Sequence, residues 1–291
     1  HSTDPRFLLY ALRSKIVQDQ IRADAVSSTI QTSNADRYAN LKIPDTPPAQ
    51  QRRIADFLDD RVARLDQIRS ARRKQIDRLW EAFGSRVTTV IDETGGQRCP
   101  LWLMAQRITD GAHVSPETDA GVYDFVSTRD LDANGVIDFD GALKTSAESY
   151  AALVRQGCRP IAGDVLFSKD GTVGRTARIN ESLDFVVASS LIIIRPIPRL
   201  LDFNYLHYLF KHAEVVHQVD AYVKGAGLPR ISIANLRRVV GIFPPLGSQA
   251  SVAQRLENEF ARTSDLVRAL NDTLGLLTEY RRSLITDAVA G

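Results

Sequence analysis

Residues 39–59 read ANLKIPDTPPAQQRRIADFLD, and residues 234–257 read ANLRRVVGIFPPLGSQASVAQRLE. Both stretches hold an Ala-Asn-Leu triplet, a proline pair, a glutamine and then apolar residues at helical spacing. From Gln51 and Gln249 onward, one offset of 198 residues, from 51 to 249, relates the two copies. The same offset pairs Leu79 with Leu277, Glu81 with Glu279, Ser85 with Ser283, Val87 with Ile285 and Thr88 with Thr286. Because chance would not keep one register for so long, the chain contains an internal repeat.

The sequence after each proline pair predicts a long amphipathic helix, over residues 47–91 and 244–290. Apolar residues recur there at three-, four- and seven-residue steps, with charged residues between them. Proline cannot continue a helix toward its N-terminus, so each pair sets where its helix begins. Some 40 helical residues extend on the order of 60 Å, too far for one compact domain. We therefore expect two spacer helices that pair with each other; the alternative is that each packs on its own domain.

Composition is that of an ordinary globular protein. The 291 residues are 44% hydrophobic, and 37 basic residues nearly balance 35 acidic ones, so only local clustering of charge could indicate a nucleic-acid partner. No run of about 18 apolar residues predicts a membrane helix, and we expect a cytoplasmic protein. Cys99 and Cys158 are too isolated for a disulfide frame or a thiolate metal site. The chain starts at His1, and residues 1–45 resemble the end of a domain, so we expect that an upstream portion is missing.

Between the repeats, residues 96–243 alternate short β-prone runs with turn residues. Strands are predicted at Val122–Ser127, Val165–Ser168 and Asp184–Arg195, with a tight turn at Asn134-Gly135. Helices are predicted at Ser146–Gln156 and Asn204–Val219. The fold class is therefore α+β, a mainly β sheet with flanking helices, plus the two long helices. The domain limits are 1–45, 46–95, 96–243 and 244–291, and residues 7–12 resemble residues 203–209 in placement before their proline pair.

Basic residues of the middle domain gather in two glycine-containing stretches. One runs from Ser168 to Arg175 (SKDGTVGR) and the other from Val223 to Arg230 (VKGAGLPR), while Arg129 follows a predicted strand. Glycine lets backbone N–H groups approach an anion, and Lys and Arg neutralise phosphate or bind guanine edges. The candidate DNA-binding residues are Arg129, Ser168, Lys169, Thr172, Arg175, Lys224 and Arg230. Taken singly, each stretch is a weak signal, because a loop of this type is usually a plain hairpin.

Catalytic alternatives lack their signatures. Phe167 stands where a nuclease would place an acid two residues before Lys169, and no phosphate-binding loop or nucleophile elbow occurs. His207, His212 and His217 are spaced by five residues, so they do not share a helix face for a metal, and we interpret them as surface or boundary residues. Asp138 and Asp140 are interpreted as solvated carboxylates of a strand-like stretch. No metal or cofactor of the chain's own is expected.

These features together resemble the specificity subunit of type I restriction–modification systems. The resemblance rests on IAGDVLFS at 161–168 running into GTVGR at 171–175, on Ser189-Ser190-Leu191, on Arg195-Pro196 and on the repeat with its proline-led helices. It covers nearly the whole chain. The sequence departs from the family in having Gln50-Gln51 and Ser248-Gln249 where Glu-Gln is usual, and in holding only the last part of a first recognition domain.

The resemblance implies a non-catalytic protein that binds double-stranded DNA. In the family, each recognition domain binds one half of a bipartite target, and the helices form an antiparallel coiled coil that docks modification subunits. Those subunits use S-adenosylmethionine to methylate adenine, and a restriction subunit uses ATP and Mg²⁺ for translocation and cleavage. A homodimer is expected if the chain is a natural half-length subunit. The rival hypotheses are a coiled-coil assembly protein that binds another protein, and a self-contained nuclease or methyltransferase.

Overall fold

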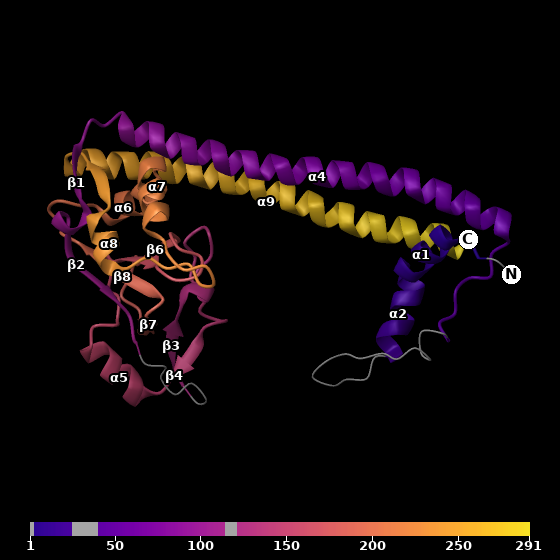
Figure 1. The fold of residues 1–291 in the computed structure, drawn as a ribbon, viewed down its shortest axis with the longest axis horizontal. Coiled ribbons are helices and arrows are strands. Elements are labelled where there is room, and N and C mark those ends of the chain that lie inside the picture. The colour runs from indigo at the N-terminus through magenta and orange to yellow at the C-terminus, as the bar shows by residue number, and fades with distance from the viewer. Residues whose placement is uncertain (1–2, 25–39, 114–120) are drawn as a thin grey trace. The chain divides into compact units, whose positions relative to one another are not determined.

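The computed structural model describes residues 3–24, 40–113 and 121–291. The chain divides into two compact units, and each is described by itself. Unit 1 comprises His1–Trp80 and Thr263–Gly291, and unit 2 comprises Glu81–Arg262. The two long helices, α4 and α9, contribute one part to each unit; they span Pro48–Asp92 and Leu246–Ala290 (Figure 1).

Both long helices begin where the proline pairs predict. Pro47 and Pro245 supply the carbonyls that accept the first helical N–H groups, with bonds of 2.9 Å from Gln51 and 3.1 Å from Gln249. Pro48 occupies the first turn of α4, where its missing N–H costs no helical bond. The predicted helices are therefore confirmed within one or two residues.

Unit 1 packs two short helices against the start of α4 and the end of α9. The short helices are α1 (Pro5–Arg13) and α2 (Lys15–Asp24). Asp4 caps α1 by accepting bonds from the N–H groups of Arg6 and Phe7. The core joins α1, α4 and α9, through buried Phe7, Tyr10, Ala11, Leu58, Val62, Ile285 and Val289. Because Leu58 and Val62 of α4 meet Ile285 and Val289 of α9, the two long helices run antiparallel in this unit.

In unit 2 the end of α4 lies antiparallel beside the start of α9. The rings of Phe83 and Phe260 stand 5.6 Å apart, and Arg86 is 3.2 Å from both carboxylate oxygens of Glu259. Phe83 also contacts Tyr208 edge-on, with ring centroids 6.3 Å apart. The helix pair thus supports the remaining elements of unit 2.

The strands of unit 2 form three sheets rather than the one sheet predicted. The orders are β1-β9, β2-β8-β5-β6 and β4-β3-β7, and the pairing is antiparallel except between β3 and β7. The strand bounds are β1 Gln97–Pro100, β2 Ala105–Asp110, β3 Tyr123–Val126, β4 Leu143–Thr145, β5 Val165–Ser168, β6 Thr176–Arg178, β7 Phe185–Val187, β8 Leu191–Pro196 and β9 Val240–Phe243. The three predicted strand regions all contain strands, with Asp184–Arg195 divided between β7 and β8. The α+β class is confirmed.

The two larger sheets pack against each other as layers through their buried side chains. Leu166 and Ile193 of the four-stranded sheet share a core with Val126 and Phe185 of the three-stranded sheet. Helix α5 (Ala147–Arg155) covers the far face of the three-stranded sheet through Leu153. Helix α6 (Phe203–Leu209) adjoins β5 and β6 of the four-stranded sheet, whereas α7 (Ala213–Tyr222) adjoins β9 and α8 (Ile233–Arg238), which precedes β9 (Figure 1).

The predicted helix Asn204–Val219 is wrong in one respect, because the structure divides it into α6 and α7. His212 interrupts it: its Nδ1 caps α7 by accepting the N–H of Glu214 at 3.3 Å. His212 Nε2 lies 3.0 Å from Asp92 on α4. The surface interpretation of the histidines is also wrong for two of them, since His207 and His212 are buried, whereas His217 is exposed. Apolar periodicity could not reveal this break, since the capping group comes from a histidine.

Two smaller predictions concern turns and acids. At the predicted Asn134-Gly135 turn, Gly135 has a φ of 88° and Leu131 bridges Ile137 across it, so the turn is confirmed. Asp138 and Asp140 are exposed, as expected, but neither lies in a strand.

The sequence repeat extends to hydrogen bonds that hold the short helices. In unit 1 the amide oxygen of Gln51 accepts the N–H of Asp4 at 2.8 Å. In unit 2 the amide oxygen of Gln249 accepts the N–H of Asp202 at 2.9 Å. Asp202 caps α6 as Asp4 caps α1. The predicted likeness of residues 7–12 to residues 203–209 is therefore matched in structure.

Two further contacts repeat at the same offset. The Tyr10 hydroxyl donates to Asp59 at 2.7 Å, and the Tyr208 hydroxyl donates to Glu257 at 2.9 Å. The N–H groups that begin α2 and α7, of Lys15 and Ala213, are bound by threonine hydroxyls of the long helices. Thr286 of α9 accepts the first at 2.9 Å, and Thr88 of α4 accepts the second at 3.0 Å. Each unit thus has one set of contacts in which a glutamine, a carboxylate and a threonine of the long helices hold two short helices. We call each set a socket.

Candidate nucleic-acid interface

The two basic stretches, far apart in sequence, meet in unit 2. The 168–175 loop follows β5, and the 224–230 hairpin precedes α8. Backbone bonds join them: Gly171 N–H donates to the Pro229 carbonyl at 2.9 Å, and Ile231 N–H donates to the Lys169 carbonyl at 3.0 Å. Arg230 Nε lies 2.7 Å from Asp170. The stretches therefore form one continuous surface.

The 224–230 hairpin is closed at its base by a pair of backbone bonds. Lys224 N–H donates to the Arg230 carbonyl at 2.9 Å, and the reverse bond is 2.8 Å long. Gly225 has a φ of 104°, and a Cβ there would lie 2.4 Å from the Leu228 carbonyl oxygen. Only glycine fits this bend, which explains the residue type at that position.

Ser168 braces the 168–175 loop from inside. It is fully buried, and its hydroxyl donates to the Thr172 carbonyl at 2.5 Å and accepts the Arg175 N–H at 2.8 Å. Gly171 and Gly174 take φ values of 70° and 98°, which allow the chain to turn around it. Ser168 is thus placed to shape the loop, whereas the Thr172 side chain is exposed.

Lys169 is buried as well, and it has an internal partner. Its ammonium lies 2.7 Å from Asp110 at the end of β2, with 11% of the lysine side chain exposed. Burial alone would raise the pKa of Asp110, but the hydrogen bond and charge of Lys169 outweigh burial and lower it. His113 Nε2 contacts the same carboxylate at 2.9 Å. Much of the charge of Lys169 is therefore neutralised inside the protein.

Arg129 and Arg175 are tied to the same surface through backbone contacts. The Ser190 carbonyl accepts both the Lys169 N–H at 2.9 Å and the Thr128 hydroxyl at 2.9 Å. This anchors the short helix η2 (Thr128–Asp130), which carries Arg129, beside the 168–175 loop. Arg175 Nη1 donates to the Leu131 carbonyl at 2.7 Å. All seven predicted residues thus belong to one connected part of the molecule.

The exposed cations of this surface are Arg129, Lys224 and Arg230. Arg129 and Arg230 keep 58% and 59% of their side chains exposed, and each contacts a carboxylate that lies beneath it. Those carboxylates, of Asp130 and Asp170, are only 4% and 12% exposed. An arginine held by a buried carboxylate still presents free N–H groups to a ligand, because a guanidinium has five. This arrangement can bind phosphate oxygens or guanine edges.

No residue pattern predicted a site role for Asp110, Asp170 or Ser190. Asp170 lies inside the 168–175 stretch, and its place next to Lys169 is the one signal for it in the sequence. Asp110 and Ser190 join the site only through strand pairing and loop contacts, which residue patterns do not show. The sequence therefore indicated the exposed cations but not their partners.

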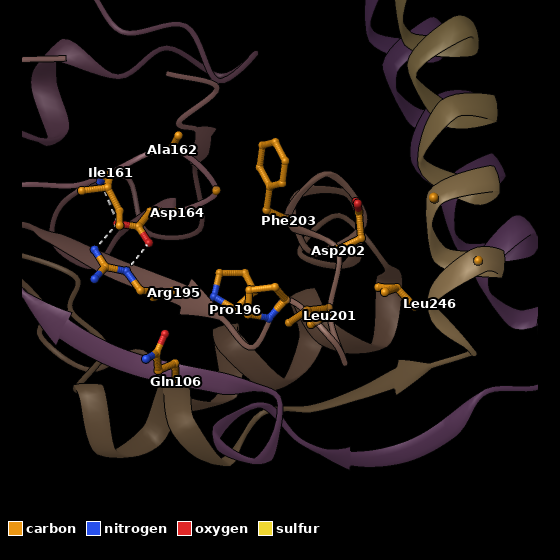
Figure 2. A pocket seen from close by; sticks show the side chains of 14 residues that line it. Gln106, Ile161, Ala162, Asp164, Arg195, Pro196, Leu201, Asp202, Phe203 and Leu246 are labelled. Atoms are coloured by element: carbon orange, nitrogen blue, oxygen red, sulfur yellow. Dashed lines mark hydrogen bonds and ion pairs between the residues drawn. The ribbon is translucent and has the colours of Figure 1, made fainter. Parts of the chain in front are cut away.

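A separate cavity of about 570 Å³ lies between the end of β8, the 161–164 turn and the start of α9 (Figure 2). Arg195 in its wall points at Asp164, with Nε and Nη2 each 2.8 Å from the carboxylate. Asp164 also accepts the Ile161 N–H at 2.9 Å. Because these charges bind each other, the cavity walls present mainly apolar groups.

Residues 3–24, 40–113 and 121–291 hold neither a metal-binding cluster nor a membrane-spanning helix. No group of three His, Cys, Asp or Glu side chains there is arranged to hold a metal ion. Nor does any helix in those ranges have the length and apolar character needed to cross a bilayer.

Comparisons with known proteins agree on one family. The family model described as the type I restriction modification DNA specificity domain matches residues 113–275. The type I restriction enzyme EcoBI specificity subunit of Escherichia coli is 21% identical over 98% of this chain, and the chain spans 65% of that relative's length. A structure from a study of complex assembly and conformational transition of the type I R-M system matches 99% of the chain and 72% of its own, at 18% identity and a TM-score of 0.73.

A crystal structure of the HsdS subunit from Thermoanaerobacter tengcongensis also matches, over 99% of the chain and 70% of its own, at 18% identity and a TM-score of 0.47. The family model covers more than half of the 291 residues, including both basic stretches and the start of α9. The chain therefore belongs to the type I restriction–modification DNA specificity family.

Proposed function

We propose that this chain recognises a double-stranded DNA sequence and carries no catalytic activity of its own. The observation that carries the proposal is the joining of the 168–175 loop, the 224–230 hairpin and η2 into one surface with three exposed cations. Family membership supports it, since the matching model is that of a DNA specificity domain.

The residues of this surface divide into two roles. Arg129, Lys224 and Arg230 are proposed to contact DNA directly, with Lys224 on phosphate and the arginines on phosphate or guanine. Ser168 and Lys169 are proposed to hold the loop in shape, because both are buried and bonded within the protein. This removes two of the seven residues, Ser168 and Lys169, from direct contact with a duplex.

The partners are proposed from the family. Modification subunits would supply S-adenosylmethionine and methylate adenine, and a restriction subunit would supply ATP-driven cleavage. The repeated sockets support a bipartite target, because α1 and α2 are held as α6 and α7 are. We propose that residues 1–45 contain the end of a first recognition domain, with a homodimer as the alternative way to pair two such domains. A cytoplasmic location follows from the proposed DNA substrate.

The proposal is tested by selecting duplexes from a random pool with the full chain and its modification subunit. Enrichment of one sequence is expected, with an affinity that falls steeply as salt rises. Failure to enrich any sequence would overturn the proposal and favour the coiled-coil assembly protein. Turnover of DNA by the isolated chain with a metal or cofactor would also overturn it.

The surface itself is tested with Arg230→Ala on the selected duplex. We expect roughly a tenfold rise in Kd and a salt slope smaller by about 0.9, because one cation that neutralises a DNA phosphate is lost. Arg155→Ala is the matched control, since Arg155 is also exposed in unit 2 but lies at the end of α5. Equal effects of the two substitutions would show that the surface is wrongly placed.

A further inference from the structure

The tip of the 224–230 hairpin is apolar although its base is charged. Between Lys224 and Arg230 the chain reads Gly-Ala-Gly-Leu-Pro, so none of the five side chains can form a hydrogen bond. All five residues are exposed, and Leu228 keeps 54% of its surface exposed. Solvated hairpin tips ordinarily carry Gly, Pro, Asn, Asp or Ser, so Ala226 and Leu228 are the unusual residues of this tip.

Leu228 is held in place rather than free to collapse onto the core. Backbone bonds at Lys224 and Arg230 close the hairpin, and the bond from Gly171 to Pro229 fixes the residue next to Leu228. A Cβ on Gly171 would lie 3.9 Å from the Leu228 Cδ1, so the leucine lies over the 168–175 loop. The Leu228 side chain therefore lies where the two basic stretches meet, with about half of the residue exposed.

The cations around it fit a groove-binding tip. Lys224 and Arg230 stand at the two sides of the hairpin base, and Arg230 is oriented by Asp170. Cations so placed can bind backbone phosphates beside the bases that the tip reaches. Protein residues that reach bases without hydrogen-bonding groups contact a thymine methyl or wedge between base steps, and leucine does both.

We propose that Leu228 makes an apolar contact with a base of the target and so contributes to sequence selection. This rests on the proposed function, and it assigns to one exposed apolar residue a base contact that does not depend on hydrogen bonds. Phosphate contacts position the protein without distinguishing sequences, whereas Leu228 would distinguish them.

The test uses the full chain, its modification subunit and the duplex selected by the unaltered protein. Leu228→Ala is expected to raise Kd roughly tenfold on that duplex, because most of one buried aliphatic side chain is lost. Its salt slope should stay unchanged, which separates it from Arg230→Ala. Leu228→Met, which keeps the apolar bulk, should restore affinity to within about twofold.

Two arms identify the base contact. Replacing each thymine by uracil removes its methyl; if that is the contact, one replacement weakens the unaltered protein but not Leu228→Ala. If the leucine is a wedge, 2-aminopurine placed along the duplex brightens at one step with the unaltered protein and not with the variant. Either result supports the proposal.

Leu183→Ala is the matched control, because Leu183 is an exposed leucine of unit 2 outside the basic surface. The proposal is overturned if Leu228→Ala binds as the unaltered protein does, if its salt slope falls, or if neither arm detects a base. Each of those results leaves DNA selection by the unaltered protein intact. Failure of the unaltered protein to select any duplex would instead remove the proposed function.

Discussion

Units 1 and 2 hold their short helices with the same kind of socket, but the structures attached to the socket differ. Gln51 and Gln249 bind equivalent N–H groups, and a tyrosine hydroxyl meets a carboxylate in both units. Every strand among the described residues belongs to unit 2, as does the basic surface. The socket is thus the constant part of the repeat, and the sheets are the variable part.

The carboxylate of each socket shows how the variable part is attached. In unit 1, Arg6 of α1 binds Asp59 at 2.8 Å. In unit 2, Glu257 instead receives Arg178, which lies on β6. An arginine from the four-stranded sheet thus meets the carboxylate that a local helix residue meets in unit 1. The equivalent carboxylates, Asp59 and Glu257, therefore bind an arginine of the adjoining short helix in one unit and an arginine of a sheet in the other.

Removing the socket glutamines should give the largest effect and should differ between the units. Gln249 is fully buried and makes three hydrogen bonds, to Asp202 N–H and to the carbonyls of Leu200 and Pro244. Gln51 makes two. We expect Gln249→Ala to cost about 3 kcal/mol and Gln51→Ala about 2 kcal/mol, because buried partners lose their bonds. Hydrogen exchange of α6 and α1 amides measures each loss separately.

Gln254→Ala is the control for this pair, since Gln254 is exposed on the same helix as Gln249. It should leave both sets of amides unchanged. A larger loss in unit 1 than in unit 2 would contradict the idea that the more buried socket is the stronger one.

Acid should affect unit 2 more than unit 1. Burial, with added repulsion from Lys211 and Arg178, holds the pKa of His207 well below its usual 6.5. A histidine with a depressed folded pKa stabilises the fold above the unfolded pKa and loses that contribution as pH falls below it. The equivalent residue in unit 1 is Leu9, which cannot titrate.

We therefore expect unit 2 to lose about 1.4 kcal/mol for each pH unit below 6.5, until the ring protonates. Amide exchange of α6 between neutral pH and about pH 5 measures the loss. The His207 ring contacts the Thr176 hydroxyl at 2.9 Å. His207→Gln can keep this contact, and it should flatten the dependence of unit 2 stability on pH. An unchanged profile in this variant would assign the acid sensitivity to other groups.

The tyrosine contacts should give the smallest effects, and equal ones. Tyr10→Phe and Tyr208→Phe each remove one hydroxyl bond to a carboxylate that an arginine also binds. A loss of about 1 kcal/mol is expected for each, measured by thermal unfolding. Unequal losses would show that the arginine from β6 compensates differently from the one on α1.

The same tyrosine in unit 1 predicts a response to alkali. Burial, and then the hydrogen bond to Asp59, raise the pKa of Tyr10 to about 12. A raised folded pKa means that this stabilisation is complete below the unfolded pKa of 10.0 and is lost as pH rises from there through about 12. Tyr10→Phe should remove this part of the alkaline loss, which ultraviolet titration of phenolate can follow.

Much of the fold could be predicted from the sequence because its signals are local. Proline pairs and apolar periodicity located both long helices, and Ser146–Gln156 predicted α5 within one residue at each end. The division of the strands among three sheets depends on pairing between distant segments, such as β1 with β9. No local pattern carries that information.

The residues of the candidate site were also only partly predictable from the sequence. Residue types identified Lys224 and Arg230, and both are exposed. Lys169 has the same residue type as Lys224, yet it is buried against Asp110, which lies 59 positions away in the chain. Charge can be recognised in a sequence, but its neutralisation by a distant partner cannot.

Each socket draws on both long helices, and this has a consequence for their alignment. In unit 2, the short helices α6 and α7 are bound by Gln249 from the start of α9 and by Thr88 from the end of α4. In unit 1, α1 and α2 are bound by Gln51 of α4 and Thr286 of α9. A slip of one helical turn, about 5.4 Å, would carry either threonine out of reach of its N–H group. The short helices therefore stabilise a single register of the long helices and disfavour every neighbouring register.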